Sequence, residues 1–325
     1  DRARRDVPRE GHGDLHLAHV YWLPEAAAPA DLVVVDCIEF NERFRYADPV
    51  ADVAFMDMDL RHKGRPDLAD AFGDAWFRAS GDEEGRALTP FYCAYRAVVR
   101  GKVDGFAARG AEIPAPERDR LRVRARGYFL LALGAVAAPP ERPALVIVSG
   151  LPGTGKSMIA RCLAESGWSR LSTDEVRKGL AGLDPMADAA AAPDRGLYTP
   201  EWTERTYEAL RDRAEARLLD GGRVVVEGTF LQESRRRMLL DLAEELRVPA
   251  LLLEVEAPES LVRSRLAQRR SDASDADWRV YLALRDRREP RGPRTAAVTH
   301  AVDNSGAPEL AWSAIREVLT GRGLA

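Results

Sequence analysis

The amino-acid sequence predicts an α/β protein in which a parallel sheet, covered by helices, follows a mostly helical first part. Three observations favour this fold class. A β-branched run at residues 146–148 leads directly into a glycine-rich loop and then into apolar residues at helical spacing. Four more expected strands alternate with helical patterns and start near residues 169, 223, 251 and 299. The first part instead shows three- and four-residue apolar spacing over residues 68–79, 89–103 and 115–136.

A proline-rich segment, residues 137–143, separates the two parts. Its prolines stop the preceding helix and supply a short stiff linker. We therefore expect one domain over residues 1–138 and a second over residues 139–325. A chain of 325 residues has enough apolar material for two cores.

The glycine-rich loop, residues 150–157, has the pattern GxxxxGKS of a phosphate-binding P-loop. Glycines let the backbone curl so that its amide hydrogens converge on phosphate oxygens, while the lysine reaches the β and γ phosphates and the serine ligates magnesium. The sequence therefore predicts a site for ATP and Mg²⁺. The residues expected to form it are Gly150, Gly153, Thr154, Gly155, Lys156, Ser157 and Met158.

The composition argues against several other classes of protein. No apolar run reaches the ~18 residues that a membrane-spanning helix needs. The three cysteines are widely spaced, which favours neither a disulfide framework nor a Cys-x-x-Cys metal site, so a reducing cytoplasm is the expected location. The formal net charge of −4 does not favour a broad nucleic-acid groove.

Polar residues follow two of the expected strands in the second part. Asp174 and Arg177 stand one helical turn apart, and Glu227 ends the run that starts near residue 223. This arrangement resembles P-loop kinases of small hydroxyl-bearing substrates, in which such an Asp faces the acceptor and a nearby Arg steers the phosphate or the acceptor. There an acidic residue in the place of Glu227 polarises the magnesium shell, directly or through water. The alternative is that residues 172–174, Ser-Thr-Asp, form a helix N-cap beside an exposed arginine.

An arginine-rich helix precedes an acidic, small-residue turn at residues 271–277. This order resembles the lid of nucleoside-monophosphate-kinase-like enzymes, which closes on the phosphates and stabilises the transferring group. Arg265 and Arg269 share a helix face and are the expected catalytic arginines, whereas a solvated face paired with acids is the alternative. Asp303, in a predicted turn, would contact the adenine base in this fold, although the same residue types form any good turn.

Residues 11–19 resemble the catalytic loop of the kinase-like phosphotransferases. In that family an Asp orients and deprotonates the acceptor hydroxyl, and an Asn five residues later holds magnesium. The resemblance assigns the first role to Asp14. The second place holds His19, which is a departure because magnesium prefers oxygen ligands.

Two further segments extend this resemblance. An apolar run, residues 32–35, is expected to form a strand ending in Asp36, where the family places its main magnesium ligand. Residues 47–55 resemble the GDPxxDLA segment of aminoglycoside phosphotransferases, in which Asp52 would brace the catalytic loop. Taken singly, these residues also fit an ordinary turn, a strand-end cap and a helix cap. Because only eleven residues precede His12, we expect a kinase-like C-lobe without its nucleotide-binding lobe.

The order of the two parts resembles bacterial fusion proteins in which an aminoglycoside phosphotransferase-like C-lobe precedes a P-loop kinase domain related to zeta toxins, polynucleotide kinases and chloramphenicol phosphotransferase. The resemblance implies an ATP- and Mg²⁺-dependent phosphotransferase that acts on an unidentified hydroxyl-bearing small molecule through its C-terminal domain. Two alternatives stay open. The second domain is an acceptor-independent ATPase or nucleotide switch, with the first part as a binding module, or it phosphorylates nucleic-acid 5′ ends. The sequence names neither the acceptor nor the oligomeric state.

Overall fold

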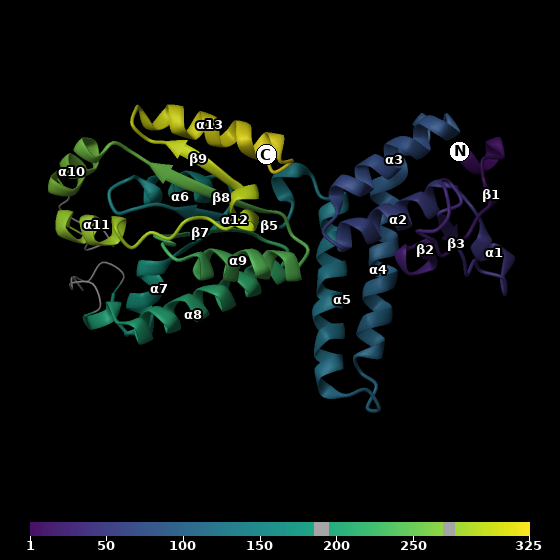
Figure 1. Ribbon diagram of the computed structural model, residues 1–325, viewed down its shortest axis with the longest axis horizontal. Helices are drawn as coiled ribbons and strands as arrows, with labels where there is room; N and C mark the ends of the chain where they lie inside the picture. Colours follow the sequence, from purple (N-terminus) through teal and green to yellow (C-terminus); the bar gives the residue numbers. More distant parts are fainter. Residues whose placement is uncertain (185–194, 269–276) are drawn as a thin grey trace. The chain divides into compact units, whose positions relative to one another are not determined.

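The structure is a computed structural model that describes residues 1–184, 195–268 and 277–325. Within these ranges the chain divides into two compact units, Asp1–Ala137 and Ala138–Ala325 (Figure 1). Each unit has its own clusters of buried apolar side chains. No helix in the described ranges is both long and apolar enough to cross a membrane.

The C-terminal unit is built on a sheet of five strands in which every neighbouring pair is parallel. The strand order is β6-β7-β5-β8-β9. Every residue of β5 and β7 is buried, as expected for central strands of a sheet that is covered on both faces. The predicted parallel sheet is therefore confirmed. Its strands are β5 (Ala144–Ser149), β6 (Ser169–Ser172), β7 (Arg223–Gly228), β8 (Ala250–Glu256) and β9 (Thr299–Asp303).

Helices cover both faces of this sheet. Buried residues of α6 (Lys156–Glu165) and α13 (Pro308–Gly321) pack with Val146, Val148 and Leu253 in one core cluster. Helices α8 and α9 contact β7 and β5, and Figure 1 shows them on the side of the sheet opposite α13. The other helices described in this unit are α7 (Thr173–Leu180), α8 (Pro200–Leu219), α9 (Glu233–Glu245), α10 (Glu259–Gln268), α11 (Trp278–Arg285) and α12 (Pro293–Ala297), with short 3₁₀ turns at Pro139–Glu141 and Gly196–Tyr198.

Strand register places the predicted functional segments at one edge of the sheet. Ser149 at the end of β5 pairs with Gly228 at the end of β7, and Ser172 at the end of β6 pairs with Glu227. Since parallel strands present their carboxyl ends to the same side, the loop after β5, the start of α7 and the loop after β7 meet there. Ligands bind at this edge in open α/β sheets.

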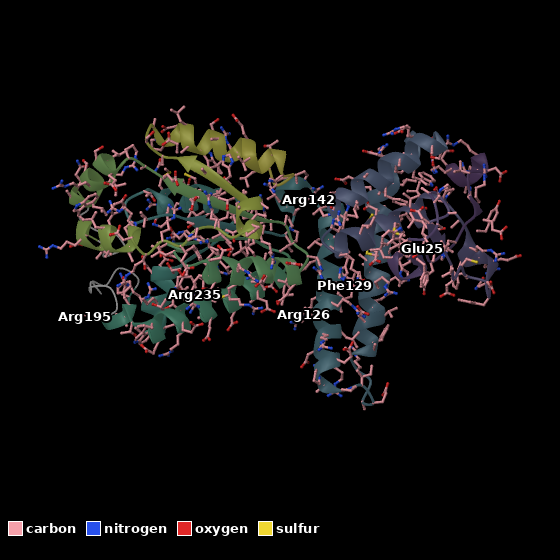
Figure 2. The ribbon with its side chains drawn as sticks, viewed as in Figure 1. Glu25, Arg126, Phe129, Arg142, Arg195 and Arg235 are labelled. Atoms are coloured by element: carbon pink, nitrogen blue, oxygen red, sulfur yellow. The ribbon has the colours of Figure 1, made fainter. Side chains whose placement is uncertain are left out.

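The N-terminal unit is mainly helical. Its largest elements are α4 and α5, which lie side by side, with α2 packed against α4 (Figure 1). The ring of Phe129 on α5, labelled in Figure 2, lies so near Gly101 of α4 that a Cβ there would be 3.2 Å from the ring. Phe55, Cys93 and Tyr128 belong to the buried cluster between these helices. The helices are α1 (Glu42–Arg45), α2 (Val50–His62), α3 (Pro66–Ser80), α4 (Thr89–Ala107) and α5 (Ala115–Val136), with 3₁₀ turns at Arg2–Arg5, Leu17–His19 and Glu83–Leu88.

The strands of the N-terminal unit are short and form two antiparallel pairs, β1 (Arg9–Glu10) with β4 (Tyr46–Ala47) and β2 (Val20–Trp22) with β3 (Leu32–Val34). This corrects one prediction, because β3 ends two residues before Asp36 and all its residues are exposed. A strand in a two-stranded ribbon has no second layer to bury its side chains, which is why an apolar run can be exposed there.

Arg223, at the start of β7, fastens both ends of the C-terminal unit. Its guanidinium lies 3.9 Å from the ring centroid of Trp168, donates a hydrogen bond of 2.6 Å to the carbonyl of Pro140 and donates another to the carbonyl of Leu324. Burial lowers the pKa of Arg223, which shows that burying its charge is costly, and these contacts offset part of that cost.

Replacing Arg223 with Met is expected to lower the free energy of unfolding by about 2–4 kcal/mol, because the carbonyl oxygens of Pro140 and Leu324 lose a charged donor. Urea denaturation followed by circular dichroism measures the difference. Arg161→Met, at an exposed position on α6, is the matched control and should change stability by less than about 0.5 kcal/mol. Equal stability of the two variants would contradict the fastening role.

Candidate active site

The loop between β5 and α6 has the backbone of a phosphate-binding loop. Gly153 and Gly155 have left-handed φ values of 80° and 101°, and Gly150 has a φ of 154°. A Cβ at Gly150 would lie 2.5 Å from the carbonyl oxygen of Val255. Side chains are therefore excluded at the turning points, and the amide groups at the start of α6 stay accessible to an anion.

Two side chains of the loop fold back on it. The Lys156 ammonium and the Thr154 hydroxyl each donate a hydrogen bond of 2.9 Å to the carbonyl of Leu151. An ammonium has three N–H donors, so a lysine in this place can contact both the loop and phosphate oxygens. The predicted ATP site thus has both the backbone cradle and a positioned cation.

A cavity of about 580 Å³ lies at the edge of the sheet where these elements meet. Its volume is in the range of small-molecule sites. Residues from the loop, from α7 and from β7 line it together with residues of α8, α9 and α11. Among them are Lys156, Ser157, Asp174, Arg177, Glu227 and Arg235.

Asp174 and Arg177 form an ion pair in the first turns of α7. The distance from Arg177 Nη1 to Asp174 Oδ1 is 2.9 Å, as their one-turn spacing predicted. The side chain of Arg177 is only 8% exposed, and its guanidinium lies 4.6 Å from the ring centroid of Tyr198. The N-cap of α7 is Ser172, so the segment that the alternative assigned to capping does cap this helix, whereas Arg177 is buried and not exposed as that alternative expected.

Glu227, the candidate magnesium ligand, is 3% exposed and bound by an arginine from the neighbouring strand. Arg170 on β6 donates to Glu227 Oε1 through Nη2 and through Nε at 2.7 Å, and it reaches Glu175 at 2.7 Å. Burial disfavours the charged form of Arg170, but the two carboxylates outweigh it and raise its pKa. Since one carboxylate oxygen is engaged, a magnesium contact would use the other, and this role of Glu227 stays a prediction.

Arg170 was not predicted from the sequence. The only local signal is a charged residue inside the four-residue strand β6, and its partner lies 57 residues away.

Arg235 on α9, labelled in Figure 2, and Glu204 on α8 form another ion pair at the cavity wall. Arg235 lowers the pKa of the Glu204 carboxyl, and its guanidinium lies 5.0 Å from the ring centroid of Tyr207. The sequence gave no indication of this pair, because residues on different helices meet only through the packing of α8 on α9.

Arg265 lies beside the loop. It donates hydrogen bonds to the carbonyls of Thr154, at 3.4 Å, and Asn304, at 3.0 Å. The buried amide of Asn304 also donates to the Thr154 carbonyl, at 2.7 Å. Arg265 therefore joins the loop to the end of β9, next to the predicted nucleotide, and its catalytic role stays a prediction. Arg269 and most of the acidic turn lie outside the described residues.

Asp303 closes its own turn, because its carboxylate accepts hydrogen bonds of 2.9 Å from both the amide and the hydroxyl of Ser305. This is the ordinary turn role that was one of its two readings. A contact of Asp303 with adenine stays a prediction.

The predicted site of the N-terminal unit brings its residues together. The distance from Asp14 Oδ2 to His16 Nε2 is 3.5 Å, and that from His19 Nε2 to Asp36 Oδ2 is 3.3 Å. The hydrogen bond from His16 holds the pKa of Asp14 below its usual range. Asp52 accepts the backbone amides of His12, at 2.7 Å, and of Gly13, at 3.0 Å, so it holds the loop in place.

Asp36 lies in an irregular segment after β3. Its own φ is 65°, and its side chain is 76% exposed. Asp14, His16 and His19 lie close enough together to hold a metal ion, and His16, which the sequence did not single out, is the buried one of the three. Assignment of catalysis to Asp14 and of a metal to Asp36 stays a prediction, as does the kinase-like identity of this unit.

Comparison with known proteins gives one family match. Residues 145–291 match the family model of an AAA domain, a range that includes the phosphate-binding loop and the residues lining the cavity but ends before β9. An uncharacterized protein of Mycobacterium bovis and one from each of two strains of Mycobacterium tuberculosis are 30% identical over 302 residues, which are 90% of this chain. The chain spans 58% of the length of these relatives.

Solved kinases are similar to the C-terminal part of the chain. A sugar kinase from Janibacter is 18% identical, with a TM-score of 0.42, over 56% of this chain and 95% of its own. A gluconokinase from Sinorhizobium meliloti is 22% identical, with a TM-score of 0.38, over 56% and 91%. A putative kinase from Chloroflexus aurantiacus is 22% identical, with a TM-score of 0.40, over 54% and 96%. Each TM-score is below 0.5, so function has to be inferred from the residues of the site itself.

Replacing Gly155 with Ala is expected to weaken ATP binding roughly 10- to 100-fold, because the left-handed φ strains an alanine by about 1–3 kcal/mol. The added Cβ would also lie 2.0 Å from Asn304 Nδ2. Titration with a fluorescent ATP analogue measures the affinity. Gly179→Ala on α7, where a Cβ meets nothing within 4 Å, is the control. Unchanged affinity of Gly155→Ala would exclude this loop as the nucleotide site.

Replacing Arg170 with Met is expected to lower the free energy of unfolding by about 3 kcal/mol, because Glu227 is left buried and unpaired. The double variant Arg170→Met, Glu227→Met should recover part of this loss, since no lone buried charge remains. Urea denaturation of both single variants and the double variant measures the coupling. Additive effects would show that the pair contributes no coupling energy.

Proposed function

We propose that the C-terminal unit is an ATP- and Mg²⁺-dependent phosphotransferase whose acceptor is a hydroxyl-bearing small molecule. The observation that carries the proposal is one shared cavity. Lys156 and Ser157 of the phosphate-binding loop and Asp174 of α7 line the same space. A phosphate donor at the loop and an acceptor beside the carboxylate would therefore meet there.

Each described group has a separate task in the proposed reaction. Lys156 and the amides at the start of α6 bind the phosphates and balance their charge. Asp174, held by Arg177 at 2.9 Å, orients the acceptor hydroxyl. The hydroxyl oxygen bonds to the γ-phosphorus, the bond from that phosphorus to the β,γ-bridging oxygen breaks, ADP leaves, and the hydroxyl proton passes to Asp174.

The residues present fit a nucleotide with magnesium. The glycine backbone leaves a cradle that a Cβ would fill, and Ser157 and Glu227 offer the hard oxygen atoms that magnesium prefers. When bound, Mg²⁺ would supply charge neutralisation for the transferring phosphoryl group. Arg265 donates to the carbonyls of Thr154 and Asn304 and so holds the end of β9 against the phosphate-binding loop. A catalytic role of Arg269 is part of the same proposal.

The volume and lining of the cavity favour transfer over simple hydrolysis. About 580 Å³ leaves room for a small acceptor besides the terminal phosphates. The hydroxyl groups of Thr173, Thr203 and Thr229 belong to the lining and can bind the hydroxyl groups of a substrate. A nucleotide switch needs no such polar chamber next to its γ-phosphate.

Replacing Lys156 with Ala and Asp174 with Asn tests the proposal. ADP release by the purified protein is measured with Mg²⁺ and ATP, with and without a panel of sugars, nucleosides, aminoglycosides, sugar acids and 5′-hydroxyl oligonucleotides. We expect one acceptor class to raise the rate at least about tenfold, and both variants to lose at least about 99% of that stimulated rate. Asp212→Asn, exposed on α8, is the control for Asp174→Asn and should keep full activity.

Two other outcomes would name a different function. ADP release that no acceptor changes, lost in Lys156→Ala but kept in Asp174→Asn, would replace the transferase with an ATPase or nucleotide switch. Stimulation by oligonucleotides alone, with an affinity that falls steeply as salt rises, would replace it with a nucleic-acid end kinase.

A further inference from the structure

Arg177 is a buried cation with few partners. Its side chain is 8% exposed, yet in residues 1–184, 195–268 and 277–325 only Asp174 accepts a hydrogen bond from it, through Nη1. A guanidinium has five N–H donors, and the Nε of Arg177 is buried without a hydrogen-bond partner. Leaving such donors unpaired is costly, which indicates that a ligand with several acceptor oxygens completes the site.

The position of Arg177 is fixed before any ligand binds. Asp174 holds one edge of the guanidinium at 2.9 Å, and the ring of Tyr198 lies 4.6 Å from its central carbon. Both contacts restrict the long side chain, so little conformational entropy remains to be lost on binding. The planar fork suits the bidentate binding of a carboxylate or phosphate.

Arg235 repeats this arrangement on another wall of the same cavity. It is paired with Glu204 and lies 5.0 Å from the ring centroid of Tyr207. Its Nε is likewise buried without a hydrogen-bond partner. Two arginines, each held by one carboxylate and one tyrosine, therefore line the chamber beside the phosphate-binding loop.

The acidic residues of the cavity do not cancel this preference. Glu227 is bound by Arg170, Glu204 is bound by Arg235, and Glu289 accepts the amide of Glu233 at 2.7 Å. Their charges are therefore balanced or hydrogen-bonded within the protein. An anion entering the chamber would meet the donors of these two arginines, besides Lys156 and Arg287, which also line it.

We propose that the acceptor carries an anionic group, a carboxylate or a phosphate, in addition to the hydroxyl that is phosphorylated, and that Arg177 and Arg235 bind this group. The inference rests on the proposed phosphotransferase function and narrows its substrate class from any hydroxyl compound to hydroxy acids and sugar phosphates. Binding of the anionic group would position the reacting hydroxyl at Asp174. Binding energy from a part of the substrate that does not react is thereby used to orient the part that does.

Direct binding separates this inference from the function on which it rests. Calorimetric titrations in the presence of ADP and Mg²⁺ compare compounds matched in their carbon chain, glycerol with glycerate, glucose with glucuronate, and ribose with ribose 5-phosphate. We expect at least one anionic compound to bind about tenfold or more tightly than its neutral counterpart. The carboxylate and phosphate pairs show which anion is selected. ADP release is measured separately, so an absence of transfer would count against the proposed function without changing the binding result.

Substitution of Arg177 and Arg235 tests whether these two side chains cause the preference for anionic compounds. In Arg177→Gln and Arg235→Gln the preference for the anion should fall to less than about twofold, whereas Arg177→Lys, which keeps the charge but not the fork, should keep part of it. Arg211→Gln is the matched control, because Arg211 lies on α8 outside the cavity lining and pairs with Glu215 and Glu245. Thermal unfolding followed by circular dichroism verifies that each variant is folded.

Three results would overturn the inference. The first is neutral compounds that bind as tightly as their anionic counterparts, and the second is no binding of any anionic compound. The third is a preference that survives in both Arg177→Gln and Arg235→Gln. If Arg177→Gln instead weakened only a non-hydrolysable ATP analogue and left ADP affinity and anion preference unchanged, Arg177 would be assigned to the γ-phosphate and not to the acceptor.

Discussion

The close packing of residues 150–155 against the rest of the sheet is the constraint on which the site depends. The carbonyl of Val255 leaves no room for a side chain at Gly150, and the amide of Asn304 occupies the space where a Cβ of Gly155 would lie. Asn304 and Arg265 both donate to the carbonyl of Thr154. The loop is thus held by β8, by the end of β9 and by α10. A preformed cradle of this kind does not have to be ordered when a phosphate binds, which favours affinity.

Charge in the chamber is organised in pairs around that loop. Glu227 is buried against Arg170, and Asp174 is held by Arg177. A lone charge would be costly at such positions, whereas a pair with further hydrogen bonds is tolerated and fixes the direction of each carboxylate. The two arginines differ in how many of their N–H donors are engaged within the protein. Arg170 uses its donors on two carboxylates, while Arg177 retains donors beyond its single partner. The pair of Arg170 and Glu227 therefore stabilises the protein, whereas the pair of Asp174 and Arg177 is suited to binding a ligand.

The sequence predicted the sheet well because its signals are local. The strands β5, β7 and β8 each contain an unbroken apolar run, at residues 144–148, 224–226 and 250–253, as expected for strands buried on both faces. Helix α8 shows a local signal of the same kind, because its buried residues Tyr207, Leu210, Ala214 and Leu218 recur at intervals of three and four. The predicted strand at β3 is present but ends before Asp36, and there the same apolar signal belongs to an exposed two-stranded ribbon. Composition alone does not tell whether a second layer will cover a strand.

For the candidate site, the sequence by itself determined the phosphate-binding loop and the pair Asp174 and Arg177, because each depends on neighbours within one turn of backbone. Only the tertiary structure decided which distant groups complete it. Arg170 meets Glu227 across 57 residues because β6 pairs with β7, and Arg265 reaches Thr154 across 111 residues because α10 folds back over the loop. Strand order and helix packing bring these side chains together, and neither is encoded in a short stretch of the chain.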